Sequence, residues 1–253
     1  MLKNIRIVMV ETTHPGNIGA AARAMKNMGL TRLFLVKPQR YPSHEATARA
    51  AGADDVLADA RICDSLDHAL EGCGLVFGAS ARSRSIPWPQ LDPRQAAARA
   101  VLGAAEGEVA LVFGREHAGL SNLELDRCNY LVTIPTNPEF ASLNVAAAVQ
   151  VLSYELRMAG LEAAPAVARV EPLASAEERE RFYGHLEQVL MDLEFLNPAN
   201  PKHLMRRLRR LFNRVELDCN EVNILRGILT AVERRGMAGK NEGPVHDASS
   251  PDD

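Results

Sequence analysis

Polar side chains that could do chemistry gather in four loops, and each loop directly follows an apolar run. Each run ends near glycine or proline. The loops then offer amide, hydroxyl, carboxylate and guanidinium groups: Asn17 and Arg23 after the first run, Ser80 and Arg82 after the third, Arg115, Glu116 and Asn122 after the fourth, and Ser142 and Asn144 after the fifth. Such groups suit the orientation of a substrate and the stabilisation of charge. Glycine lets backbone approach a ligand, so main-chain groups are expected to contribute contacts as well.

Several common chemistries do not fit these loops. The glycines of "GCGLVFG" at 72–78 precede a strand, whereas a dinucleotide fingerprint follows one and opens a helix. The segment "FGREHAGLSN" lacks the Gly-Lys-Ser/Thr of a phosphate-binding loop. The seven histidines are scattered without a paired carboxylate, which argues against a metal, and no serine lies in a Gly-x-Ser-x-Gly elbow.

Five short apolar runs, at 5–11, 32–38, 75–80, 109–114 and 130–136, predict buried strands. Alanine-rich stretches between them, at 19–29, 44–53, 92–105 and 139–160, predict helices. This alternation over 160 residues indicates an α/β domain with a parallel sheet covered by helices. Its ligand site is expected at the carboxyl ends of the strands.

The second part of the chain predicts a small helical unit. We place the α/β domain at 1–160, a linker at 161–174, a helical extension at 175–236 and a disordered tail at 237–253. Ser175 followed by Glu178 forms a capping-box pattern that opens the first helix, and "NPANP" at 197–201 ends it. The next helix is expected to place Leu204, Leu208, Leu211 and Val215 on one face, with arginines around the rest.

Charge is distributed unevenly in a chain of ordinary composition, with 47% apolar and 24% charged residues and a net charge of -3. Residues 1–160 carry 16 basic and 16 acidic side chains, whereas residues 201–236 carry 9 and 4. A basic segment on a neutral body indicates a local surface for a polyanion. No apolar run is long enough for a membrane span, and four scattered cysteines without a leader favour reduced thiols and a cytoplasmic location.

Three segments together carry a specific resemblance: "NIGAAAR" at 17–23, "FGREHAGLSN" at 113–122 and "IPTNPEFASLNVAAAV" at 134–149. In this order they resemble the motifs of SPOUT-superfamily RNA 2'-O-ribose methyltransferases of the TrmH-like group. Residues 193–229 resemble the helical extension of one branch, which acts on cytidine or uridine at position 32 of the tRNA anticodon loop. The resemblance implies a deep trefoil knot in the last part of the sheet domain, a homodimer, S-adenosylmethionine as methyl donor, tRNA as partner and no need for a metal.

The resemblance also implies roles for individual residues. The catalytic set is Asn17, Arg23, Glu116, Ser142 and Asn144. The methyl donor is expected to contact Ala79, Ser80, Ala81, Gly114, Ile134, Ala141, Ser142 and Leu143. The RNA is expected to contact Arg82, Arg84, Arg115, Lys202, Arg206, Arg207, Arg209 and Arg210. Arg23 would orient the RNA and stabilise the developing alkoxide, since arginine stays protonated.

Plainer interpretations stand beside these roles. Asn17, Ser142 and Asn144 are all good helix caps. Glu116 has two interpretations: its carboxylate anchors loop amides, or it forms a salt bridge with Arg115. The basic helix from Lys202 has only Phe212 as an aromatic, so stacking on bases is not expected to dominate there. Two other functions remain open: a non-catalytic RNA-binding protein or chaperone on the same scaffold, and a methyltransferase for a base or for ribosomal RNA ribose.

Overall fold

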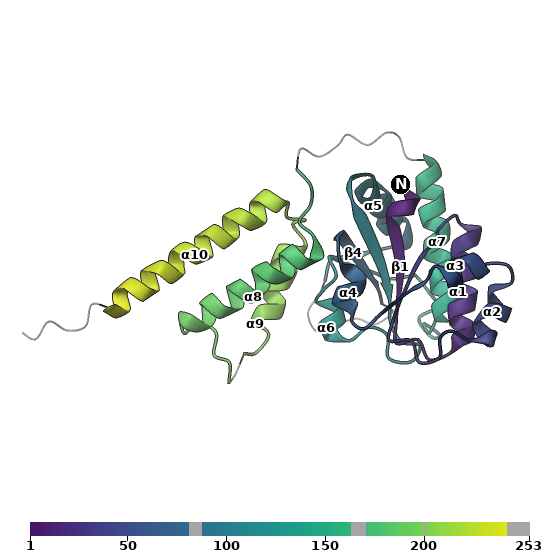
Figure 1. Ribbon diagram of the computed structural model, residues 1–253, viewed down its shortest axis with the longest axis horizontal. Helices are drawn as coiled ribbons and strands as arrows, with labels where there is room; N and C mark the ends of the chain where they lie inside the picture. The colour runs from purple at the N-terminus through teal and green to yellow at the C-terminus, as the bar shows by residue number, and fades with distance from the viewer. Residues whose placement is uncertain (81–87, 163–170, 200, 242–253) are drawn as a thin grey trace, which may run out of the picture.

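The computed structural model describes residues 1–80, 88–162, 171–199 and 201–241, with side chains to Arg235. Its first part is an α/β domain around a seven-stranded sheet of order β3-β2-β1-β6-β4-β7-β5, in which every pair of neighbours is parallel (Figure 1). The strands are β1 (Ile5–Val10), β2 (Arg32–Val36), β3 (Arg61–Cys63), β4 (Cys73–Ala79), β5 (Gln90–Leu91), β6 (Glu108–Phe113) and β7 (Tyr130–Val132). The predicted α/β class and parallel sheet are confirmed.

Helices cover both faces of the sheet, because neighbouring residues of each strand point to opposite sides. One face carries Ile7 of β1 and Leu33 of β2 and is covered by α1 (Pro15–Asn27), α2 (His44–Ala50), α3 (Asp54–Ala58), α5 (Pro93–Glu106) and α7 (Val145–Glu162). The other face carries Val8 and Phe34 and is covered by α4 (Leu66–Leu70) and α6 (Asn122–Leu125). A single turn of 3₁₀ helix, η1 (Leu2–Asn4), precedes β1.

The central strands were predicted well, and the edges were not. Strands β3 and β5 were missed because they are only three and two residues long and partly exposed, so they lack a continuous apolar run. The fifth predicted strand ends at Val132 rather than at residue 136, and α7 begins at Val145 rather than at 139. Pro135 and Pro138 lie in the irregular segment between them, since proline cannot donate to a strand or helix interior. Strand order does not fix how the chain is threaded, so the knot stays a prediction.

The second part is a unit of three helices, α8 (Ala176–Asp192), α9 (Leu204–Asn213) and α10 (Cys219–Asn241), which packs beside α4 and β4 (Figure 1). Its core holds Phe182, Tyr183 and Leu217. The predicted capping box is confirmed: Ser175 accepts from the Glu178 amide while the Glu178 carboxylate accepts from the Ser175 amide.

Three details of the helical unit differ from expectation. Helix α8 ends at Asp192, before "NPANP", and Glu194 follows in a left-handed conformation with φ 57°. On α9, Leu208 and Phe212 pack against the core, whereas Leu211 and, just after the helix, Val215 are exposed. Helix α9 therefore turns a different face to α8 than the leucine spacing suggested. Helix α10 runs to Asn241, since the expected tail begins with the helix formers Met237 and Ala238. Parts of the linker (163–170) and of the tail (242–253) lie outside the described residues.

Candidate functional site

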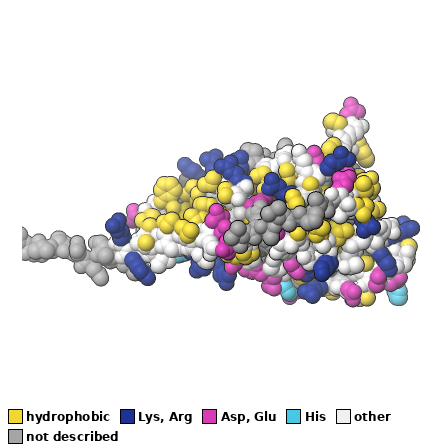
Figure 2. Space-filling model, turned by 90° about the horizontal axis from the view of Figure 1, so that it is seen from above, with side chains coloured by type: hydrophobic (Ala, Val, Ile, Leu, Met, Phe, Trp, Pro, Cys, Tyr) yellow, Lys and Arg dark blue, Asp and Glu magenta, His cyan; other side chains and the backbone are white. Residues whose placement is uncertain are grey.

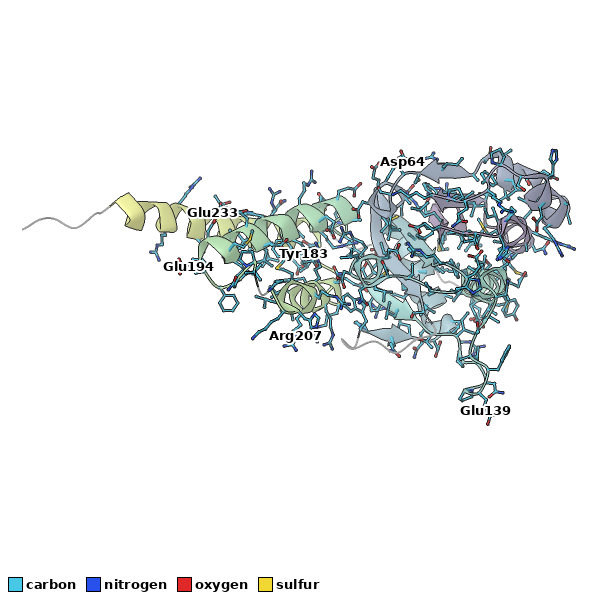
Figure 3. All side chains as sticks on the ribbon, turned by 90° about the horizontal axis from the view of Figure 1, so that it is seen from below. Asp64, Glu139, Tyr183, Glu194, Arg207 and Glu233 are labelled. Atoms are coloured by element: carbon cyan, nitrogen blue, oxygen red, sulfur yellow. The ribbon has the colours of Figure 1, made fainter. Side chains whose placement is uncertain are left out.

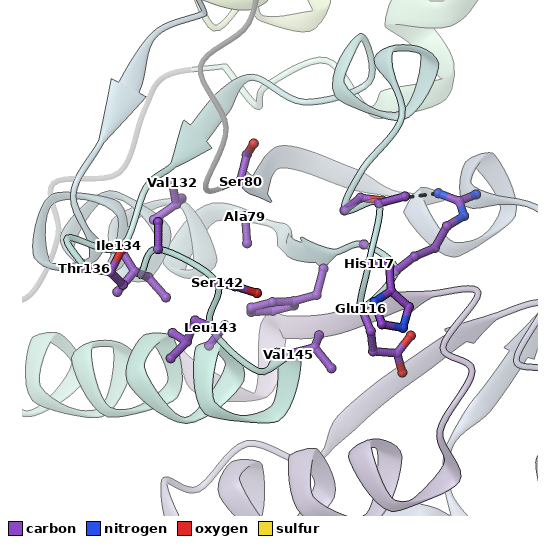
Figure 4. A pocket seen from close by; sticks show the side chains of 17 residues that line it. Ala79, Ser80, Glu116, His117, Val132, Ile134, Thr136, Ser142, Leu143 and Val145 are labelled. Atoms are coloured by element: carbon purple, nitrogen blue, oxygen red, sulfur yellow. Dashed lines mark hydrogen bonds between the residues drawn. The ribbon is translucent and has the colours of Figure 1, made fainter. Parts of the chain in front are cut away.

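A pocket lies at the carboxyl ends of β4, β6 and β7, where a parallel sheet is expected to place its ligand site (Figure 4). Its walls come from the ends of these strands, from the loop after β6 and from the segment that leads into α7. The lining residues are Ala79, Ser80, Phe113, Gly114, Arg115, Glu116, His117, Ala118, Gly119, Val132, Ile134, Thr136, Ala141, Ser142, Leu143, Val145 and Ala148.

All the described residues that we expected to contact the methyl donor line this pocket: Ala79, Ser80, Gly114, Ile134, Ala141, Ser142 and Leu143. Ala81 lies outside the described residues. Phe113, Val132 and Val145 were missed, because a buried apolar residue at a strand or helix end carries no sequence signal that separates a pocket wall from core. The wall is thus mainly apolar, and its polar residues are Ser80, Arg115, Glu116, His117, Thr136 and Ser142.

The loop after β6 is closed on itself by backbone contacts. The amide of Arg115 donates to the Gly119 carbonyl, and the amide of Gly119 donates to the Arg115 carbonyl. Gly119 has φ +66°, a conformation that favours glycine. A Cβ on Gly114 would lie 2.1 Å from the Gly119 carbonyl carbon, so only glycine fits where the loop crosses itself.

Glu116 is the centre of a hydrogen-bond network that joins this loop to the start of α1. Its carboxylate accepts from the Thr13 amide at 3.1 Å, the Thr13 hydroxyl at 3.0 Å, the His14 amide at 3.2 Å and Asn17 Nδ2 at 3.0 Å. Burial by itself would raise the pKa of Glu116, but these hydrogen bonds, with that from Asn17 foremost, hold it at about 2. Of the two interpretations, the structure supports the anchoring of loop amides and not a pair with Arg115.

Asn144 extends the network to α7. Its Nδ2 donates to Asn17 Oδ1 at 3.0 Å, while its own Oδ1 accepts from the amides of Ala146 and Ala147. Asn144 therefore caps α7 and also contacts Asn17, while its catalytic role stays a prediction. Asn17 does not cap α1, whose N-cap is His14. Ser142 is exposed and lines the pocket.

The predicted arginines fall into two groups. Arg115 donates to Glu124 at 3.0 Å and to Glu11 at 2.9 Å, and these hydrogen bonds, that to Glu124 first, raise its pKa. It is thus committed within the protein rather than free for phosphate. Arg23 is exposed on α1, makes no hydrogen bond or ion pair with any residue that the structure describes, and does not line the pocket. Arg82 and Arg84 lie outside the described residues.

The basic residues of α9 divide in the same way. Arg206 pairs with Asp126 at 3.0 Å, and Arg209 pairs with Glu180 while its guanidinium lies over the Tyr183 ring. The Nε of Arg210 is buried. Lys202 and Arg207 are exposed and pair with none of the described residues. Figure 2 shows hydrophobic side chains beside Lys and Arg on one face of the helical unit. On α10, Ile224 and Ile228 are exposed.

A buried polar junction joins the helical unit to the sheet, and the sequence analysis missed it. Asn129, 1% exposed, accepts from the Val76 amide of β4 at 2.9 Å and donates to the Asn213 carbonyl of α9 at 3.2 Å. Arg179 of α8, 4% exposed, donates to the Gly74 carbonyl at 2.8 Å. Burial lowers the pKa of Arg179. A lone asparagine before a strand and an arginine within an acidic run carry no signal for such a junction.

In the described part of the chain, no group of three or more His, Cys, Asp or Glu side chains could hold a metal ion, and no helix is long and apolar enough to cross a membrane.

Comparison with known proteins gives the family. Residues 4–154 match the model of the SpoU rRNA Methylase family, and residues 177–242 match that of the tRNA methyltransferase TrmJ C-terminal domain. The chain is 54% identical to "tRNA (cytidine/uridine/adenosine-2'-O-)-methyltransferase TrmJ" of Pseudomonas aeruginosa, with 95% of this chain and 98% of that protein covered. It is 53% identical to the cytidine/uridine TrmJ of Escherichia coli K12, with 96% and 100% covered.

Solved structures agree. TrmJ from Zymomonas mobilis superposes with a TM-score of 0.79 at 35% identity, covering 90% of this chain and 98% of that chain. A probable methylase family protein from Haemophilus influenzae superposes with a TM-score of 0.62 at 44% identity, covering 94% and 100%. Matches to both parts of the chain, over nearly its whole length, establish that it belongs to the SpoU methylase family and to the TrmJ group within it.

Proposed function

We propose that this protein transfers a methyl group from S-adenosylmethionine to the 2'-hydroxyl of a cytidine or uridine ribose at position 32 of the tRNA anticodon loop. The observation that carries the proposal is the pocket at the strand ends, bordered by the network of Glu116, Asn17 and Asn144. The TrmJ relatives of the chain are named as 2'-O-methyltransferases of cytidine and uridine in tRNA, and position 32 comes from the resemblance of the helical extension. Because the substrate is tRNA, we infer that the protein acts in the cytoplasm.

The pocket fits the methyl donor. Apolar side chains such as Phe113, Ile134 and Leu143 suit the faces of an adenine ring, and the turns at Gly114 and Ala141 present main-chain groups to its edges. At Gly114 the backbone of the loop occupies the space that a side chain would otherwise fill. When bound, S-adenosylmethionine supplies a methyl group already activated on a sulfonium, which is why no Lewis acid is needed in this proposal.

Side chains around the pocket divide into positioning and contact roles. The Glu116 carboxylate is filled with donors and has a pKa of about 2, so we infer a positioning role in place of proton transfer. It holds Asn17, which in turn holds Asn144. Ser142 lines the pocket, so we infer that its hydroxyl lies beside the methyl donor. Arg23 has no partner among the described residues, which leaves its charge for an RNA phosphate or the developing alkoxide.

We infer a homodimer in which the segment 140–159 forms part of the interface. Phe140 and Tyr154 are 76% and 49% exposed and Leu143 is 38% exposed, which is a large apolar surface for one short segment to leave in water. The pocket borders this segment, and a second copy placed here would lie close to it. Sedimentation equilibrium tests the proposal: a mass of twice 27.6 kDa is expected. A monomeric mass at micromolar concentration would contradict it.

The helical unit is proposed to hold the tRNA. Lys202 and Arg207 are its predicted cations with free charge, whereas Arg206 and Arg209 mainly fix the unit internally and to the sheet domain. Each phosphate that is neutralised should steepen the salt dependence of binding by about 0.7 to 0.9 on a log-log scale.

The test is methyl transfer from tritiated S-adenosylmethionine to unmodified tRNA by the wild type and by Arg23→Ala. We expect label at one anticodon-loop nucleotide that resists alkaline hydrolysis, and its loss in Arg23→Ala. The matched control is Arg94→Ala, since Arg94 is 88% exposed on α5. Tight tRNA binding without transfer by the wild type would favour the binding-protein alternative. Methyl transfer to ribosomal RNA in place of tRNA would favour the alternative of a ribosomal RNA methyltransferase.

A further inference from the structure

A second pocket lies in the helical unit, at the turn that joins α8 to α9. It is lined by Phe195, Leu196, Asn197, Pro201, Lys202, His203, Leu204 and Arg207, which we call the turn pocket. None of these residues belongs to the site at the strand ends. The turn is bracketed by two non-glycine residues in left-handed conformations, Glu194 at φ 57° and Lys202 at φ 48°.

The turn pocket contains an aromatic ring that the fold leaves in water. Phe195 is 68% exposed, although Leu196 next to it is buried. Phe212, the aromatic that the sequence analysis considered for RNA stacking, is instead half-buried and packs edge-on against Phe182 at 5.0 Å. The unit thus uses one phenylalanine for its core and presents another at a concave surface.

Two cations of the turn pocket are free of partners. The side chains of Lys202 and Arg207 make no hydrogen bond or ion pair with the described residues, whereas Arg206 and Arg209 of α9 are paired with Asp126 and Glu180. Figure 3 shows Arg207 on α9 and Glu194 just after the end of α8. A ring and two unpaired cations are the groups that a single-stranded nucleotide needs: a face on which its base stacks and positive charge for its phosphate.

We propose that the turn pocket binds one unpaired nucleotide of the tRNA, with its base stacked on Phe195 and its phosphate at Lys202 and Arg207. This inference rests on the proposed function, since it names how the helical unit holds the same substrate. Stacking accepts any base, so the turn pocket adds affinity without selecting a sequence. An acidic peptide would satisfy the two cations but would leave the ring unused, and the nucleotide accounts for both.

The experiment uses the full-length protein and compares Phe195→Ala with Phe195→Trp. Binding of unmodified tRNA is measured by fluorescence anisotropy at several salt concentrations, and S-adenosylmethionine binding by calorimetry. Because base stacking has a known range of strength, Phe195→Ala should weaken tRNA binding about 5- to 100-fold, while Trp keeps wild-type affinity. The salt slope should stay unchanged in Phe195→Ala and should decrease by about 0.7 to 0.9 in Arg207→Ala. Affinity for the methyl donor should stay the same.

The control is Ile224→Ala, which removes an apolar side chain that is 63% exposed on α10 of the same unit. Equal effects of Phe195→Ala and Ile224→Ala on tRNA binding would overturn the proposal. So would equal competition by a five-residue oligouridylate and by a polyglutamate of matched charge, since that result assigns the turn pocket to charge alone. A wild type that methylates tRNA while Phe195→Ala keeps its KM and kcat refutes only this inference. A wild type that transfers no methyl group refutes the proposed function.

Discussion

Replacement of Glu116 by glutamine tests how much the loop network contributes to stability. The pKa of Glu116 is about 2, against an ordinary value of 4.5. Since a pKa difference of one is worth about 1.4 kcal/mol, full linkage would give roughly 3 kcal/mol. The carboxylate is partly exposed and screened by solvent, so we expect Glu116→Gln to lower the free energy of unfolding by about 1 to 2 kcal/mol at pH 7.

The pH dependence provides the sharper test. The folded-state pKa of Glu116 is lower than the unfolded one, so its stabilisation is complete above about pH 4.5 and is lost as the pH falls through about 2. The difference between wild type and Glu116→Gln in urea unfolding should therefore be constant from pH 7 to 5.5 and less than half as large at pH 3. Glu139→Gln, an exposed glutamate, is the control. A difference that stays the same at pH 3 and pH 7, or one below about 0.5 kcal/mol at pH 7, refutes the reasoning.

Three further variants test packing and polar contacts. Gly114→Ala should lower Tm and weaken S-adenosylmethionine binding at least tenfold, because its Cβ meets backbone at 2.1 Å. Gly107→Ala is the control, since a Cβ at Gly107 has no atom within 4 Å, and calorimetry should show an unchanged Tm and unchanged S-adenosylmethionine binding. Asn129→Ala should cost about 2 to 4 kcal/mol in urea unfolding, because it leaves buried groups unpaired, and a loss below about 1 kcal/mol would contradict the junction. Asn144→Ala should lower the free energy of unfolding by about 1 kcal/mol and abolish methyl transfer. Asn144→Ser should restore the stability, because serine also caps a helix, but not the transfer; full transfer by Asn144→Ser would show that the contact to Asn17 is unimportant.

Local patterns predicted the parts of the fold that depend on local sequence. The continuous apolar runs of β1, β2 and β6 identified buried parallel strands, and Ser175 with Glu178 identified the start of α8. Strand β5 was not found, because its two residues are stabilised by pairing with β7 and carry little signal of their own.

The same division applies to the candidate site. Gly114 and Ala141 to Leu143 could be assigned to the methyl donor because the segments 113–122 and 134–149 resemble family motifs, and the structure places these residues in one pocket. The partners of Glu116 were not predictable, because Thr13 lies 103 residues away along the chain and is brought near only by the pairing of β1 with β6. Likewise, the half-buried state of Phe212 depends on which face α9 turns to α8.

The junction at Asn129 has a consequence for how the substrate is chosen. Asn129 contacts β4 and α9, Arg179 ties α8 to β4, and β4 ends at Ala79 in the pocket. The helical unit is therefore held rigidly against the sheet domain, and the distance between this unit and the reaction site is fixed. A tRNA held by the helical unit would then present to the pocket only the nucleotide that lies at that length along its own fold. The distance between the helical unit and the pocket would thus select the modified position, and either pyrimidine would be accepted at that position.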